Sequence, residues 1–190
     1  MTTWTFKSLT AGAVCLALAG CATAPTEETP ATDGALSSAV LARGTVALAP
    51  PEGYCIDQES LSDTFALMAR CGSLGGTTQF GAPVAVITAA VASQTVAASI
   101  FGRAFANDSE TILSRRQAES ITLTHVKGTP PSPGMRDVYW RGISQIDGQL
   151  LGLTIYEAKG GASLGEQAPD LLRQTLRRTK EKTAARTAAN

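Results

Sequence analysis

The sequence feature that most constrains the fold is a two-residue turn signal, Asp147-Gly148, between two runs of strand-forming residues. The runs cover residues 138–146 and 149–157. Asp-Gly favours a type I′ turn, in which both central residues need positive φ and whose twist matches that of paired strands. The two-residue turn sets the register, so Trp140 is predicted to lie opposite Ile155. The face that carries Trp140 is predicted to be the core side, and the opposite face to be at least partly exposed.

Shorter apolar segments predict further antiparallel strands. Residues 44–49 and 120–126 alternate apolar and polar side chains, which is typical of a half-buried strand. Residues 53–56 and 65–71 are expected to pair antiparallel through their short connection. Residues 84–91 form an apolar run that fits a buried strand or the start of a helix, and its β-branched residues favour the strand.

Two helices are predicted in the middle of the chain. Residues 96–106 carry apolar side chains at helical spacing. A second, short helix is expected through Ile112 and Leu113, with Asp108 or Ser109 as its cap.

A terminal helix is expected to run to about Lys182, with a frayed tail over residues 183–190. Ser163 and Glu166 fit a capping box at its start. Pro169 would then lie inside the helix, so the regular part is alternatively expected to begin at Pro169 itself.

These elements predict an α+β fold with a mostly antiparallel sheet, a C-terminal β-hairpin and a terminal helix. One domain is expected to span residues 37–190. The element order resembles the PsbP-like sandwich, in which a closing hairpin precedes a terminal helix.

The amino-terminal end predicts export. Lys7 precedes an apolar run of about ten residues, which is too short to cross a bilayer that needs about 20. Residues 1–20 are therefore predicted to be a cleavable signal peptide. Leu18-Ala19-Gly20-Cys21 resembles the lipobox of bacterial lipoproteins. This resemblance implies that Cys21 is acylated and becomes the first residue of the mature chain after cleavage. The lipid on Cys21 would then attach the protein to a membrane.

The stretch after Cys21 is predicted to be a flexible tether, because it is rich in Pro, Thr and acidic residues and has little to bury. The lipidated cysteine and the tether together cover residues 21–36. By resemblance to the lipoprotein sorting rule, in which Asp after the cysteine retains a protein at the inner membrane, Ala22 implies the outer membrane, with the domain in the periplasm.

Two cysteines remain once Cys15, in the apolar run, and Cys21 are set aside. After export, Cys55 and Cys71 would meet an oxidising compartment, and we expect them to form a disulfide. A metal site is disfavoured because these two thiols, 16 positions apart, lack a second pair of ligands nearby. Closing a loop of this length is worth about 3 kcal/mol.

One catalytic motif is present. Residues 161–165 match the G-x-S-x-G pattern of serine hydrolases, with Ser163 as the candidate nucleophile. In that family a histidine follows the serine in the sequence, whereas the one histidine here, His125, precedes it. The strand before Ser163 also closes a hairpin, and the nucleophile elbow follows a strand of a parallel sheet. We therefore predict a helix-capping role for Ser163, with a small serine hydrolase as the alternative.

No cofactor or metal site is predicted. A single histidine without a free cysteine cluster suits zinc poorly, and the acidic residues of the 57–64 loop lack the spacing of a calcium loop. The chain has 16 Lys+Arg and 16 Asp+Glu, so its charge does not suggest nucleic acid as a partner. The basic outer face of the terminal helix would fit a solvated surface or contact with anionic lipid or peptidoglycan.

Residues 53–57, 65–71 and 139–141 resemble segments of uncharacterised Gram-negative envelope lipoproteins, a resemblance that implies no activity. We predict a non-enzymatic binding or assembly accessory that is anchored to the envelope. The exposed hairpin face, with Tyr139, Arg141 and Tyr156, is the candidate surface for other envelope proteins. A small-ligand-binding module, with a pocket between sheet and helices, is a further alternative.

Overall fold

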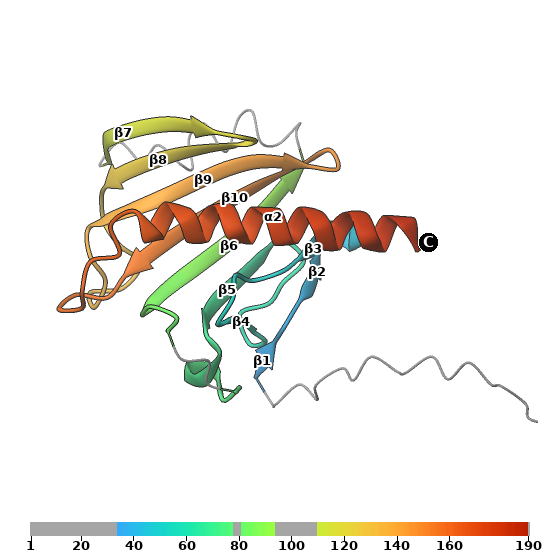
Figure 1. Cartoon of the computed structure of the whole chain (residues 1–190), viewed down its shortest axis with the longest axis horizontal. Coiled ribbons are helices and arrows are strands. Elements are labelled where there is room, and N and C mark those ends of the chain that lie inside the picture. Colours follow the sequence, from blue (N-terminus) through green and yellow to red (C-terminus); the bar gives the residue numbers. More distant parts are fainter. Residues whose placement is uncertain (1–33, 78–80, 94–109, 190) are drawn as a thin grey trace, which may run out of the picture.

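The computed structural model describes residues 34–77, 81–93 and 110–189. In these residues an eight-stranded antiparallel sheet carries one long helix across one of its faces (Figure 1). The strand order is β1-β4-β5-β6-β10-β9-β8-β7. The strands are β1 Ala35–Leu36, β4 Tyr54–Asp57, β5 Phe65–Arg70, β6 Ala85–Ser93, β7 Thr111–Ala118, β8 Ile121–Lys127, β9 Val138–Ile146 and β10 Gln149–Glu157.

The hairpin of β9 and β10 has the predicted bounds and register. Trp140 lies opposite Ile155, and Asp147 and Gly148 have the positive φ angles that a type I′ turn requires, 45° and 74°. On its other side β10 pairs with β6 over nine residues. The hairpin therefore joins the two halves of the sheet.

The terminal helix α2 covers the face of the sheet that carries Trp140. It spans Gln167–Ala188 and contacts β8, β9 and β10 before it passes a separate two-stranded sheet. Leu172 and Leu176 are buried against the sheet and belong to its main hydrophobic core. Pro169 falls in the first turn, where its missing N–H costs no helical hydrogen bond. No helix in the described part of the chain is long and apolar enough to cross a membrane.

Both ends of α2 differ from expectation. The predicted capping box of Ser163 and Glu166 does not form, because the helix begins at Gln167 and Glu166 itself holds the cap position without a side-chain cap hydrogen bond. Ser163 lies before the helix, and its Oγ accepts from the backbone N–H of Gly165. The tail after Lys182 is helical and does not fray before Ala188. The reason is tertiary: the backbone N–H groups of Ala47 and Ala49 donate to Thr183 Oγ1 at 3.0 Å and Thr179 Oγ1 at 3.1 Å.

The small sheet that receives the end of α2 consists of β2, Ala39–Leu41, and β3, Val46–Leu48. The 3-10 helix η1, Ala42–Gly44, connects them. All three residues of β3 are buried, which confirms a strand in this part of the sequence. Ordered structure begins earlier than the expected boundary at Ser37, because β1 pairs Ala35 with Asp57.

The cysteine prediction is confirmed. Cys55 and Cys71 form a disulfide with their Cα atoms 4.8 Å apart. β4 and β5 pair antiparallel as expected, with Cys55 opposite Ala69. The 3-10 helix η2, Cys71–Leu74, starts directly after β5, so Cys71 is its first residue.

The predicted short helix through Ile112 and Leu113 is wrong. Both residues lie in β7, which pairs with β8 along its length. A helix of one or two turns is marginal on its own, whereas the open edge of β8 supplies a ladder of hydrogen bonds. The predicted helix over residues 96–106 lies outside the described residues.

Candidate functional site

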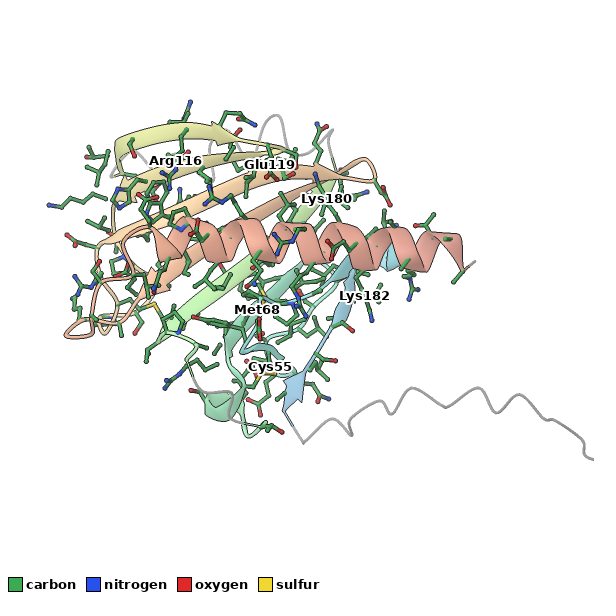
Figure 2. The ribbon with its side chains drawn as sticks, in the orientation of Figure 1. Cys55, Met68, Arg116, Glu119, Lys180 and Lys182 are labelled. Atoms are coloured by element: carbon green, nitrogen blue, oxygen red, sulfur yellow. A yellow bond between two sulfur atoms is a disulfide. The ribbon has the colours of Figure 1, made fainter. Side chains whose placement is uncertain are left out.

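A cavity of about 530 Å³ opens on the helix-facing side of the sheet, where the strands β7, β8 and β9 meet the segment that leads into α2. We call it the arginine cavity. Figure 2 shows Arg116, one of its lining residues, beside the amino-terminal end of α2. Its charged lining residues are Arg115, Arg116, Arg136, Glu157 and Glu166.

Three strands build the floor of the arginine cavity. Pairing places Ser114 of β7 opposite His125 of β8, and His125 opposite Trp140 of β9. The imidazole of His125 stacks on the indole of Trp140, with ring centroids 4.4 Å apart and planes 8° apart. Because side chains directly opposite on paired strands stand side by side, the register itself produces this stack.

Arg116 lies over the Trp140 ring of this pair. Its guanidinium carbon is 4.7 Å from the centroid of the Trp140 ring, which is cation–π geometry. Its Nη2 donates to Glu166 Oε2 at 2.7 Å. The side chains of Arg116 and Glu166 are 37% and 75% exposed, so this ion pair is screened by water and holds both groups weakly.

Arg136 and Glu157 organise the wall formed by the loop before α2. Arg136 Nη2 donates to the carbonyl of Gly161 at 2.7 Å, and its Nε lies 3.5 Å from Glu157 Oε2. The backbone N–H of Leu164 donates to the same carboxylate oxygen at 3.1 Å. Because the Glu157 side chain is only 10% exposed, this carboxylate is a fixed part of the wall.

The pKa of His125 lies below its usual range, chiefly because burial disfavours the charged imidazolium. The Arg116 cation lowers this pKa further, whereas the carboxylates of Glu157 and Glu166 raise it. The net effect favours a neutral ring at neutral pH.

Ser163, the candidate nucleophile of the alternative hydrolase reading, lies at the same cavity but is not arranged as part of a catalytic triad. Ser163 is exposed, and its Oγ accepts a hydrogen bond from the backbone N–H of Gly165 at 3.4 Å. Within the described part of the chain, no hydrogen bond joins Ser163 to His125. The nearby Glu157 carboxylate contacts Arg136 and Leu164, so it does not orient the imidazole.

The hairpin face with Tyr139, Arg141 and Tyr156 is less exposed than expected. Tyr139 is 2% and Arg141 8% exposed, whereas Tyr156 is partly exposed. Both buried side chains contact Glu110: the Tyr139 hydroxyl donates to Oε1 at 2.6 Å, and Arg141 donates to both carboxylate oxygens at 2.6 Å. Burial and the Glu110 hydrogen bond raise the pKa of Tyr139. Tyr139 and Arg141 therefore form an internal cluster with Glu110, and Tyr156 is the member of the predicted surface that stays partly exposed.

Sequence reasoning missed the arginines and glutamates of the cavity, apart from the expected capping role of Glu166. Arg116 faces the cavity only because residues 111–118 form a strand, and alternation along that strand was the one available signal. Arg136 lies in a loop, where no periodic pattern marks a side chain as inward. Cys21 lies outside the described residues. Within those residues, no group of three or more His, Cys, Asp or Glu side chains is placed to hold a metal ion.

The chain matches no family model, and no curated protein is significantly similar to it.

Proposed function

We propose that this protein is a lipid-anchored envelope protein whose domain binds a small ligand in the arginine cavity and does not transform it. The single observation that carries the binding role is the cavity itself. Its volume of about 530 Å³ falls in the usual range for small-molecule sites, about 300–1,000 Å³. Its floor is made by three paired strands, and sites on such elements hold their side chains more precisely than sites on loops.

The anchor is proposed from the sequence. Residues 1–20 would be removed as a signal peptide, Cys21 would carry the lipid, and the tether that follows would connect it to the domain. Acylation by more than one chain gives stable attachment, and Ala22 favours the outer membrane with the domain in the periplasm. For the fold, the order of closing hairpin and terminal helix supports a PsbP-like sandwich.

Binding without chemistry is favoured because the candidate catalytic groups have other contacts. The His125 ring is stacked on Trp140, and the Glu157 carboxylate contacts Arg136 and the Leu164 N–H. Neither group is placed to activate Ser163 as a nucleophile, which needs a base within hydrogen-bond reach.

The anchor is tested by mass spectrometry of the protein from its native envelope. We expect a chain that begins at an acylated Cys21, and a Cys21→Ser variant that lacks the lipid and is released from membranes on fractionation. An unmodified mature amino terminus, or an intact leader, would remove the lipoprotein assignment.

Ligand binding is tested by native mass spectrometry of the same preparation in nonionic detergent. We expect a bound mass in the wild type that is lost in Ser114→Trp, which fills the floor of the cavity. Leu113→Trp is the matched control, because Leu113 is the exposed neighbour on β7 and does not line the cavity. Equal bound mass in both variants, or none in the wild type, would contradict a binding role for this cavity.

A second candidate is a small serine hydrolase, favoured by the presence of Ser163 and His125 at one cavity. A fluorophosphonate probe separates the two. Labelling that is lost in Ser163→Ala would establish the hydrolase, and an unlabelled wild type supports the binding role.

A further inference from the structure

The charge of the arginine cavity indicates the ligand class. Arg116 and Arg136 line it against two glutamates, and His125 adds no charge while its ring is neutral. Arg115 also borders the cavity, but alternation along β7 places its side chain on the opposite face of the sheet from Arg116. One of the glutamates, Glu166, is 75% exposed and holds Arg116 through a screened ion pair. A bound anion that displaced Glu166 would therefore meet the two arginines and one fixed carboxylate, Glu157.

The two central arginines keep hydrogen-bonding capacity for such an anion. A guanidinium has five N–H donors, yet the hydrogen bonds of Arg116 and Arg136 within the described residues both come from Nη2. The Nε atoms of both side chains are buried without a hydrogen-bond acceptor there. Turning the Arg116 guanidinium toward a ligand would thus break no polar contact at Nε, whereas turning that of Arg136 would break no hydrogen bond there but would lengthen its 3.5 Å contact with Glu157 Oε2.

The size of the cavity argues for an organic anion over a bare oxyanion. Its volume of about 530 Å³ far exceeds the space of a single water-sized group, about 30 Å³. Val138, His125 and Trp140 supply apolar lining next to the arginines. An acid group held by the arginines would leave room for an apolar body beside these residues.

We propose that the arginine cavity binds an organic anion, whose carboxylate or phosphate group is held by Arg116 and Arg136 and whose apolar part packs beside Val138 and His125. This inference rests on the proposed function, because it names the ligand class of the same cavity. Charge-assisted hydrogen bonds to arginine are stronger than neutral ones and often bidentate, which suits both acid groups.

Trp140 provides the readout. The chain has two tryptophans, Trp4 and Trp140. With Trp4→Phe, the tryptophan fluorescence comes from Trp140 alone, whether or not residues 1–20 are removed. In nonionic detergent, we titrate this protein with benzoate, phenyl phosphate and the neutral benzamide. We expect a saturable fluorescence change whose Kd for at least one anion is about tenfold or more below that for benzamide, and the comparison of benzoate with phenyl phosphate identifies the acid group.

Variants place the binding at the arginines. Arg116→Gln and Arg136→Gln should each weaken anion binding by about tenfold or more, whereas Arg178→Gln, at an exposed position of α2 outside the cavity, should leave it unchanged. Glu166→Gln should tighten binding, because it removes the competing carboxylate from an exposed position where its side chain caps nothing. A gain of affinity cannot come from damage to the fold.

Three results would overturn the ligand class. They are benzamide binding as tightly as benzoate, equal losses in Arg178→Gln and Arg116→Gln, and no response to either anion. Saturable benzamide binding that is lost in Ser114→Trp would overturn the anionic ligand class and still support a ligand cavity. This variant is measured by isothermal titration calorimetry, because it adds a tryptophan to the cavity. Absence of any bound mass from the native envelope protein, in contrast, overturns the proposed function itself.

Discussion

The imidazole of His125 lies flat against the indole of Trp140, with 4.4 Å between the ring centroids and 8° between the planes. Neighbouring positions on β8 and β9 impose this contact. It places the one histidine of the chain in a partly desolvated site next to Arg116 and two carboxylates.

The lowered pKa of His125 predicts acid sensitivity. In the unfolded chain the imidazole titrates near its ordinary pKa of about 6.5, and in the folded protein it titrates lower. Between the two values the unfolded state binds more protons, so the free energy of unfolding should fall as pH drops through this window and gain nothing above it. We expect wild type to lose more stability than His125→Phe in urea unfolding between about pH 7.5 and pH 5. Equal losses would contradict the shift, since both proteins share all other titrating groups.

The buried cluster of Glu110 and Arg141 predicts a large effect when one partner is removed. Arg141→Met leaves the Glu110 carboxylate as an uncompensated buried charge, and breaking such a pair costs about 3–5 kcal/mol of unfolding free energy. Glu166→Gln breaks the exposed pair with Arg116 and should cost less than about 1 kcal/mol. Chemical denaturation measures both variants, and similar small losses would mean that the buried pair contributes no more than the exposed one.

Hydrogen bonds between α2 and β3 predict that two threonines hold the helix end in place. Thr179→Val and Thr183→Val each leave a backbone N–H, of Ala49 or Ala47, without its acceptor, at a cost of about 1–3 kcal/mol. The control is Thr187→Val, at an exposed position whose hydroxyl bonds only within the helix, and it should change stability by about 0.5 kcal/mol or less. Losses as small as the control's in both Thr179→Val and Thr183→Val would show that the small sheet does not depend on these contacts.

The disulfide predicts redox-dependent stability. The Cys55→Ala/Cys71→Ala double variant should lose about 3 kcal/mol, because the crosslink no longer restricts the unfolded chain. Reduction should lower the urea midpoint of wild type and leave that of the double variant unchanged. If reductant shifts both midpoints equally, the loss does not arise from this bond.

Local sequence determined the elements that carry their own signals. Asp147-Gly148 specifies a turn whose geometry sets the pairing of β9 with β10. The bounds of these two strands, their register and the face that packs on the core could therefore be predicted without knowledge of the rest of the chain. The pairing of β4 with β5 and the approach of Cys55 to Cys71 followed in the same way, because the partners are close in the sequence.

Tertiary structure decided the features whose partners lie far away. Residues 111–118 are a strand because β8 offers an edge, and Arg141 is buried because Glu110, 31 residues upstream, meets it. The last turns of α2 are ordered by Ala47, 136 residues before Thr183. The arginine cavity likewise exists only where the loop before α2 meets β7, β8 and β9. A pattern of side chains can specify a period and a turn, but which distant surface satisfies a charge or a backbone N–H depends on packing that only the complete fold supplies.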